Sequence, residues 1–334
     1  MPMRDTLKSE IEKFAIVYNQ ENLKDGVRFF VYPINFTELH NLLKKLSKQY
    51  DVRVHSSLGG LVVEIRESKD RIWINIVLLI ATFFSTTLMG ATMFGTFDII
   101  GGIEYSMAIM FVLGFHEMGH YFFARRWGMK TSLPYFIPFP SLIGTLGAVI
   151  KHRGVIPSRK ALFDVGVSGP IFGIIASSIV TYIGLKMEFK PIQNGEIMLV
   201  LGIPPLFDFI AKIAGFNGYF IHPVAFAGWV GMFVTFLNLI PVGQLDGGHI
   251  LRAMIGMKAD YISKIIPLLL IIVGLVTNSS IWLFWGLITT FFAMQRHPKM
   301  DDESPLDFKR IFIGIITFAI GLACFTPVPF RVNV

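Results

Sequence analysis

Cysteine and charge are both scarce in this chain of 334 residues. The single cysteine, Cys324, excludes an intrachain disulfide and a cysteine-based metal cluster. Charged residues make up 16%, against about a quarter in soluble globular proteins, whereas hydrophobic residues reach 53%. The mean hydropathy is +0.59. These values exclude a disordered chain, a collagen and a disulfide scaffold, and they favour a membrane protein.

The charge that is present is unevenly distributed. Residues 1–71 hold 12 Lys/Arg and 10 Asp/Glu, which indicates a small soluble domain ahead of a multispan membrane domain. The net charge of +7 does not indicate nucleic-acid binding, because most later basic residues flank apolar runs, as membrane orientation requires. The first 20 residues lack the apolar core of a signal peptide, so we expect a cytoplasmic N-terminus.

The first 71 residues are predicted to form a small α+β domain in the order α-β-α-β-β. Helical periodicity covers residues 4–20 and 36–49. Short strands are expected at residues 27–34, 52–55 and 61–65, the last two joined across residues 56–60. No catalytic motif stands out in this domain, and both a docking or gating role and a role as a folding cap remain open.

Apolar runs follow, and we interpret them as about seven transmembrane helices. They cover residues 72–94, 105–124, 163–185, 224–242, 262–276, 281–294 and 311–325. The segment 199–215 is too interrupted for a span, and an interfacial position fits it. Residues 262–294 can form a tight hairpin or one long helix. With the hairpin, the inner segments carry 17 Lys/Arg and the outer segments 4, so the positive-inside rule favours it.

The loop over residues 131–150 is apolar, but no helix can run through its prolines and glycines. These are Pro134, Pro138, Pro140, Gly144 and Gly147. Irregular backbone at membrane depth is tolerated only beside protein or a water-filled cavity. We therefore expect a re-entrant β-like element near the cytoplasmic face.

The sharpest motif is His116-Glu117-x-x-His120 in the second predicted span. Two histidines four residues apart share one face of a helix, so both imidazoles can bind one Zn²⁺, and Glu117 can reach water on that metal. The composition gives roughly 0.006 chance matches to this motif, so a coincidence is a poor explanation. A pair of structural histidines is the alternative, but three ionisable groups inside a span are costly and usually functional.

Asp246 is the candidate for a third ligand. A hydrolytic zinc site usually has three protein ligands and one position for water. Asp246 lies at the inner end of the fourth predicted span, which runs in the same direction as the second. A proline and three glycines around it break helix geometry and let the carboxylate turn inward. The alternative role is capping the helix that starts near His249.

With these motifs, the chain resembles the site-2 protease family of intramembrane zinc metalloproteases over roughly residues 72–260. The resemblance rests on H-E-x-x-H, on the N-x-x-P…L-D-G segment that begins at Asn238, and on the G-x-S-G-P run at residues 166–170. It extends to the subgroup with plant plastid members and archaeal or bacterial relatives. The family's common N-P-D-G is absent, because Gln244-Leu245 precede Asp246. Gly169-x-x-x-Gly173 is interpreted as close helix packing.

The resemblance implies an enzyme that hydrolyses peptide bonds of transmembrane protein substrates near the cytoplasmic face. It implies one Zn²⁺ per chain on His116, His120 and Asp246, with Glu117 as the general base that activates zinc-bound water. Asn238 would support the scissile carbonyl, or else pack two helices together. The predicted organisation is a cytoplasmic α+β domain (1–71), a catalytic transmembrane core (72–260) and a C-terminal transmembrane extension (261–334).

The predicted setting is the cell membrane, with the lipid bilayer and transmembrane substrates as partners and no nucleic acid. One rival function is a metal transporter or a zinc-stabilised receptor, but a transporter needs ligands and no base such as Glu117 beside them. A second rival is a catalytically inactive relative that only binds membrane proteins. The presence of all four residues, His116, Glu117, His120 and Asp246, argues against it.

Overall fold

The computed structural model describes residues 2–46, 50–57, 60–67, 72–92, 97–153, 156–188, 198–295 and 300–333. The chain divides into two compact units, residues 1–71 with 152–154, and residues 72–151 with 155–334. Each unit has a hydrophobic core of its own.

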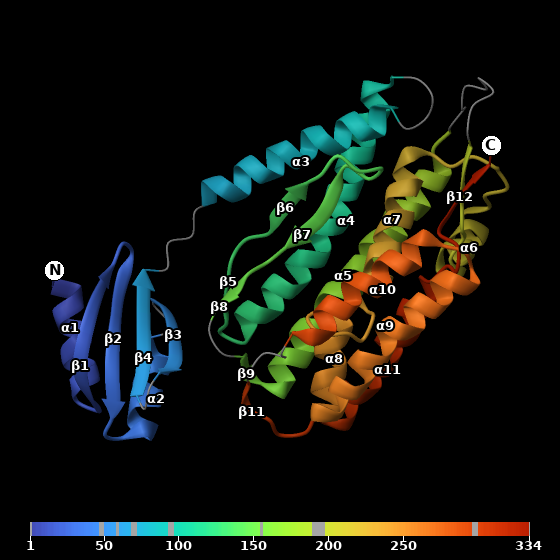
Figure 1. The fold of residues 1–334 in the computed structure, drawn as a ribbon. Coiled ribbons are helices and arrows are strands. Elements are labelled where there is room, and N and C mark those ends of the chain that lie inside the picture. Colours follow the sequence, from blue (N-terminus) through green and yellow to red (C-terminus); the bar gives the residue numbers. More distant parts are fainter. Residues whose placement is uncertain are drawn as a thin grey trace. The chain divides into compact units, whose positions relative to one another are not determined.

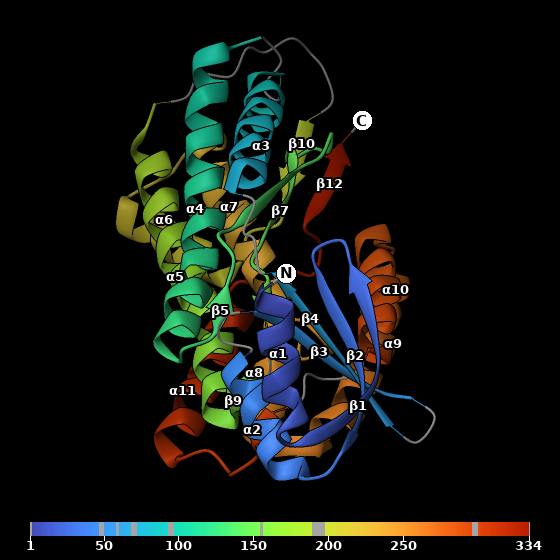
Figure 2. The ribbon, with the colours of Figure 1, turned by 90° about the vertical axis from the view of Figure 1, so that its left-hand side faces the viewer.

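The N-terminal unit is a four-stranded antiparallel sheet covered by two helices. Its elements are α1 (Pro2–Glu12), β1 (Ala15–Leu23), β2 (Gly26–Pro33), α2 (Phe36–Leu46), β3 (Tyr50–Ser57) and β4 (Gly60–Glu67). The strand order is β1-β2-β4-β3. Both helices cover the same face of the sheet (Figure 2). Apolar side chains of α1 and α2, such as Ile11 and Leu39, are buried there against Phe29 and Ile65 of the strands.

The observed order is α-β-β-α-β-β, so the helix predicted for residues 4–20 is wrong beyond Glu12. The segment that follows forms β1, which pairs with β2 from Ala15↔Pro33 to Leu23↔Gly26. Its β-branched and aromatic side chains favour a strand, and β2 supplies the hydrogen-bond partners. The second helix and the other three strands are confirmed, whereas residues 47–49 and 58–59 of those predictions lie outside the described residues.

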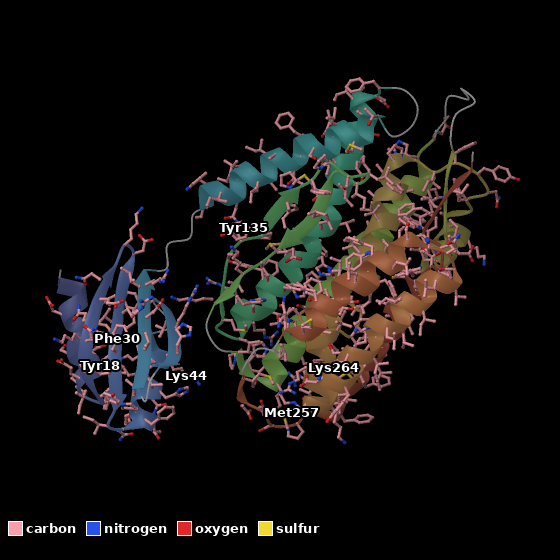
Figure 3. The ribbon with its side chains drawn as sticks, viewed as in Figure 1. Tyr18, Phe30, Lys44, Tyr135, Met257 and Lys264 are labelled. Carbon is pink, nitrogen blue, oxygen red and sulfur yellow. The ribbon has the colours of Figure 1, made fainter. Side chains whose placement is uncertain are left out.

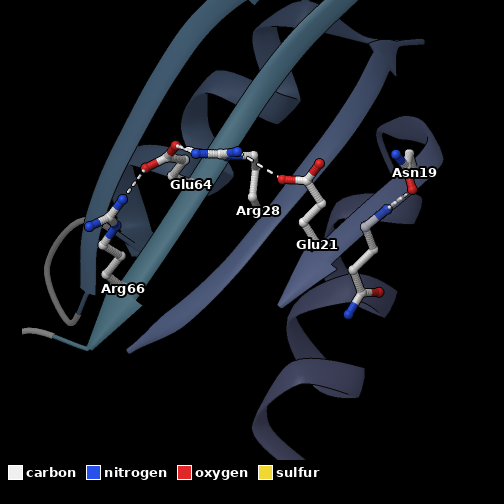
Figure 4. Close-up of polar contacts among 6 residues, drawn as sticks. Asn19, Glu21, Arg28, Glu64 and Arg66 are labelled. Atoms are coloured by element: carbon white, nitrogen blue, oxygen red, sulfur yellow. Dashed lines mark hydrogen bonds and ion pairs between the residues drawn. The ribbon is translucent and has the colours of Figure 1, made fainter. Parts of the chain in front are cut away.

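An ion network centred on Glu64 lies on the sheet face opposite the helices (Figure 4). Arg28 donates two hydrogen bonds to Glu64 Oε1, at 2.9 and 2.7 Å, and Arg66 donates one to Oε2 at 2.9 Å. Arg28 also pairs with Glu21. Hydrogen bonding by Arg28, followed by that of Arg66, holds the pKa of the Glu64 carboxyl below its ordinary value. Tyr18 and Phe30 lie on the strands of the same unit, with ring centroids 6.1 Å apart (Figure 3).

Replacing Glu64 with Gln is expected to speed hydrogen exchange in β2 and β4 roughly tenfold, because two guanidinium groups lose their shared counter-charge. The lowered pKa of Glu64 means that its stabilisation is complete above its ordinary pKa of 4.5 and is lost as the pH falls through the folded-state value. Exchange measured by mass spectrometry on the full chain, corrected for intrinsic rates, tests both effects. Glu21→Gln, with a side chain 47% exposed, is the control and should change exchange less than about threefold. Equal changes in exchange for the two variants would contradict the expectation that the buried Glu64 stabilises the sheet more than the exposed Glu21.

The chain from residue 72 onward is mostly helical. The helices are α3 (Ile72–Thr92), α4 (Ile99–Arg126), α5 (Arg159–Lys186), α6 (Pro205–Ala214), α7 (Pro223–Asn238), α8 (Asp246–Ile255), α9 (Ala259–Val276), α10 (Ser280–Met294) and α11 (Phe308–Ala323), with a 3-10 turn at Gly256–Lys258. The strands are short: β5 (Lys130–Thr131), β6 (Tyr135–Pro138), β7 (Thr145–Val149), β8 (His152–Arg153), β9 (Ile156–Ser158), β10 (Met198–Leu201), β11 (Met300–Asp302) and β12 (Phe330–Asn333).

Among the described residues, four helices are long and apolar enough to cross a membrane. They cover residues 72–92, 99–126, 159–186 and 246–276, the last combining α8, the turn and α9. The apolar helices α7 and α10 have 16 and 15 residues, and α11 has 16. A hydrocarbon core needs about 20 residues of helix. The predicted helical membrane protein thus agrees with the structure, whereas the count of seven spans is not confirmed.

Residues 262–294 form a hairpin of two helices, α9 and α10, and not one long helix (Figure 1). Asn278 in the connecting turn has a φ of 50°, a left-handed conformation that asparagine tolerates better than most residues. Gly274 near the end of α9 packs against Leu283 near the start of α10. Gly286, further along α10, packs against Ile271, so the two helices run in opposite directions.

A β-hairpin of β6 and β7 fills the predicted irregular loop. Its register runs from Tyr135↔Val149 to Pro138↔Thr145, and it lies along α3 and α4 (Figure 1). Asn75 and Ser85 of α3 and Tyr105 of α4 donate hydrogen bonds to backbone carbonyls of this segment at Leu133, Pro134, Gly144 and Ile143. The β-like element is therefore confirmed, and polar side chains of two long helices satisfy its backbone groups.

Asp164, near the start of α5, joins three helices. Arg310 of α11 donates hydrogen bonds to both carboxylate oxygens, at 2.7 and 2.9 Å. Trp127, directly after α4, donates its indole N–H to Oδ2 at 3.1 Å. Arg310 also pairs with Asp307, the residue that caps α11. The carboxylate of Asp164 thus holds the ends of α4, α5 and α11 together.

Candidate metal centre

His116 and His120 lie one turn apart on the same face of α4, as their spacing predicts. Their Nε2 atoms are 3.2 Å apart, and their side chains are buried. The Nδ1 atom of His120 lies 2.8 Å from the backbone carbonyl oxygen of Val165 in α5. Because a carbonyl oxygen only accepts, this contact assigns the proton of a neutral His120 to Nδ1. The lone pair on its Nε2 then faces His116.

Asp246 brings a carboxylate to the same point from the beginning of α8. Its Oδ2 atom is 3.2 Å from Nε2 of His116 and 3.3 Å from Nε2 of His120. The N-cap of α8 is Leu245, whose side chain makes no capping hydrogen bond, and Asp246 is the first residue inside the helix. The alternative interpretation of Asp246 as a helix cap is therefore wrong, because its carboxylate contacts the histidines instead.

The three side chains fit a divalent metal ion. The two Nε2 atoms and Oδ2 form a nearly equilateral triangle with sides of 3.2–3.3 Å. Tetrahedral zinc with nitrogen and oxygen ligands at about 2.0–2.1 Å requires ligand atoms about 3.3 Å apart. Imidazole nitrogens and a carboxylate oxygen are donors that zinc prefers, and a cation offsets their mutual repulsion. These residues can thus hold one metal ion.

The turn that presents Asp246 is supported by the helices that follow it. Gly243 in this turn has a φ of 48°, which glycine adopts without strain. Its backbone N–H donates a 2.8 Å hydrogen bond to Ser263 Oγ in α9, and a Cβ atom at this position would collide with the backbone of Phe292 in α10. The glycine is visible in the sequence, but these partners are not. A buried serine in the apolar α9 was the available signal.

Glu117 and Asn238 complete the group of residues that the motifs predicted. Glu117 is buried, and the backbone of Ile150, directly after β7, lies near its carboxylate. Asn238 is the last residue of α7, and its Nδ2 atom is 3.5 Å from Nε2 of His116. The structure thus brings the five predicted residues together where α7 ends beside the second half of α4, as the parallel direction of the two spans requires. Their chemical roles remain predictions.

Val165 was missed by the sequence analysis. Its carbonyl oxygen accepts hydrogen bonds from Nδ1 of His120 and from Oγ of Ser168, the latter at 2.7 Å. A backbone acceptor carries no signature of its own in the sequence. The serine three residues later was the nearest signal, because buried serines in helices commonly bond to a carbonyl of the preceding turn.

Comparisons with known proteins cover the same region. Residues 104–278, just over half of the chain, match the Peptidase family M50 model, and this range contains all five predicted site residues. "Probable zinc metallopeptidase EGY3, chloroplastic" of Arabidopsis thaliana is 29% identical over 276 residues, which is 75% of this chain and 47% of that protein. "Probable zinc metalloprotease EGY1, chloroplastic" of Oryza sativa subsp. japonica is 31% identical over 195 residues, 55% of this chain and 33% of that protein.

The chain spans less than half the length of these curated relatives. No solved structure matches the chain. The family match, which extends from within α4 to just past the end of α9, confirms the predicted resemblance to the site-2 proteases. This chain is a member of Peptidase family M50.

Proposed function

We propose that this protein is an intramembrane zinc metalloprotease that hydrolyses peptide bonds of transmembrane substrates near the cytoplasmic face. The observation that carries this proposal is the triangle of His116, His120 and Asp246 within a unit of membrane-length helices. The carboxylate of Glu117, one residue from a predicted ligand, favours a hydrolase over a metal carrier. The relatives named as zinc metalloproteases support zinc as the metal.

The residues around the site have separate tasks in this proposal. Zinc on His116, His120 and Asp246 would supply a Lewis acid that polarises the scissile carbonyl and makes water more acidic. Glu117 takes a proton from the attacking water and later gives it to the leaving amine. Asn238 donates a hydrogen bond from Nδ2 to the carbonyl oxygen as negative charge develops there.

The hairpin of β6 and β7 is proposed to hold the substrate. A transmembrane helix hides its carbonyls in its own hydrogen bonds, so it must unwind locally before cleavage. An unwound segment can add to the hairpin as a further strand. β7 ends at Val149, and the backbone of the next residue, Ile150, lies near the carboxylate of Glu117. A substrate strand paired there would continue directly to the catalytic carboxylate.

Hydrolysis is tested with purified chain and a panel of single-span test substrates carrying a fluorophore at each end. Wild-type protein should release fragments cut within the apolar segment, and a zinc chelator should stop the reaction. Persistence of cleavage after complete zinc removal would contradict the proposed chemistry.

We also propose seven spans in the cell membrane with residues 1–71 in the cytoplasm, supported by the basic residues of the inner segments. Single cysteines in a Cys324→Ser background test this orientation. Lys151→Cys should react with a membrane-impermeant maleimide from the cytoplasmic side, and Tyr219→Cys, at a side chain 99% exposed, from the outer side. As a control, a membrane-permeant maleimide should label both cysteines. Labelling of Lys151→Cys from the outer side would contradict the proposed orientation.

A further inference from the structure

Two glycines of α5 lie directly against the two histidines of the candidate metal centre. Gly169 and Gly173 are one turn apart on α5, as His116 and His120 are on α4. A Cβ atom at Gly169 would lie 2.6 Å from Cδ2 of His120 and closer still to Nε2. A Cβ atom at Gly173 would lie 2.7 Å from Nδ1 of His116. Since real Cβ atoms stay at least 3.0 Å from such neighbours, neither position has room for a side chain.

We propose that Gly169 and Gly173 are positioning residues of the metal centre, because they set where the rings of His120 and His116 lie. The proposal rests on the metal-binding role proposed above. It extends the interpretation of this glycine pair as helix packing, because the two glycines pack against the imidazole rings of His120 and His116.

The ring of His120 has little freedom to move away from α5. Its Nδ1 atom is held at 2.8 Å by the carbonyl of Val165, which belongs to the same helix as Gly169. Helix α5 therefore restricts the ring of His120 twice: Gly169 packs against the ring, and the carbonyl of Val165 holds its Nδ1 atom. A displacement that relieves a Cβ at position 169 must stretch this hydrogen bond or turn Nε2 away from Asp246. Metal–ligand distances tolerate deviations of about 0.2 Å, which is less than the required shift.

The ring of His116 is confined in a similar way. The space beside Gly173 is shared by Nδ1 of His116 and by Oγ1 of Thr235, which would lie 2.9 Å from the added Cβ. Thr235 is itself 1% exposed and belongs to α7, three residues before Asn238. A methyl group at position 173 must therefore push the ring of His116, even where the side chain of Thr235 turns away from it.

A third glycine of the same helix provides the matched control. A Cβ atom at Gly184 would lie 2.6 Å from Cα of Ala225 in α7, as crowded as the position at Gly169. Gly184 is 15 residues further along α5, about four turns away. Its neighbours are backbone atoms of α7 near the opposite end of that helix from Asn238. Gly184→Ala thus reproduces the crowding between helices without touching a predicted ligand.

The experiment compares metal binding by the full purified chain in four forms: wild type, Gly169→Ala, Gly173→Ala and Gly184→Ala. Co²⁺ replaces zinc, because its visible absorption bands report the arrangement of the ligands as well as the affinity. We expect both variants at the histidines to bind Co²⁺ about 10–100-fold more weakly with shifted bands. Gly184→Ala should keep the wild-type affinity and spectrum even if its melting temperature falls. Circular dichroism and a monodisperse elution profile establish that each variant is folded.

Wild-type affinity and spectra in both histidine-facing variants would overturn this inference and leave the proposed function intact. An equal loss in Gly184→Ala would also overturn it, because helix packing would then explain the effect. A wild-type chain that binds neither Co²⁺ nor Zn²⁺ would overturn the metal centre itself. If Gly169→Ala does not fold, the metal binding of Gly173→Ala alone decides. This variant is expected to fold, because the added methyl group meets side-chain atoms only, and the side chain of Thr235 can adjust.

Discussion

Replacing Glu117 with glutamine should slow substrate cleavage by about 10²–10⁴-fold while the metal remains bound. Glutamine has the same size as glutamate and keeps a side-chain carbonyl oxygen that accepts hydrogen bonds, but it cannot take a proton from water. The side chains of His116, His120 and Asp246 are unchanged. Initial cleavage rates measured together with the zinc content of the same samples separate the two effects.

Glu104→Gln is the matched control for this experiment. Glu104 also lies on α4, near the opposite end of the helix, where it pairs with His222 at 3.4 Å. Its replacement removes a carboxylate of the same kind from the same helix and should leave the cleavage rate near that of the wild type. Cleavage by Glu117→Gln at the wild-type rate would contradict the role of Glu117 as general base. It would favour the metal-transport alternative, which requires the metal ligands but no base.

Loss of a ligand should give a different pattern, in which metal and activity disappear together. His116→Ala and His120→Ala each leave two of three protein ligands, so the zinc content should fall from about one per chain toward zero, and cleavage should fall to background. Asp246→Asn should lower both, because an amide is a poorer zinc ligand than a carboxylate. Elemental analysis of folded protein measures the occupancy.

The control for the ligand variants is His55→Ala in the N-terminal unit, which should retain the wild-type zinc content, since its side chain is exposed on β3. The decisive variant is the double replacement of His116 and His120 by alanine. One zinc per chain in that folded double variant would show that the metal binds elsewhere. The predicted site would then have to be abandoned, together with the mechanism built on it.

The site residues could be predicted because their signals are local. A spacing of four residues places His116 and His120 on one helix face whatever surrounds the helix. The glycines around Asp246 likewise indicate a turn from the sequence alone. The contacts of Val165 and Gly169 depend on the register between α4 and α5, which no local pattern contains. The same limit explains why Gly169-x-x-x-Gly173 could be interpreted as helix packing but not as a contact with the ligands.

The errors in the fold also arise where distant partners decide. The segment beginning at Ala15 has apolar residues that fit both a helical and a strand period, and its pairing with β2 selects the strand. The apolar run 224–242 suggested a full span, but α7 ends at Asn238 and a turn leads to α8. Hydropathy locates apolar runs, whereas Pro241 and the tight turn determine where the helix stops.

The ion pair of Asp164 and Arg310 also sets an order of events during synthesis. Arg310 follows Asp164 by 146 residues, and ribosomes add about 5–20 residues per second, so roughly 7–30 s separate the two residues. Of the contacts that hold this carboxylate, the one from Trp127 can form at once, since Trp127 precedes it in the chain. The nascent α5 therefore carries a carboxylate that lacks its cation until α11 is translated. Assembly of this end of the bundle thus finishes after His116, His120 and Asp246 have all been made.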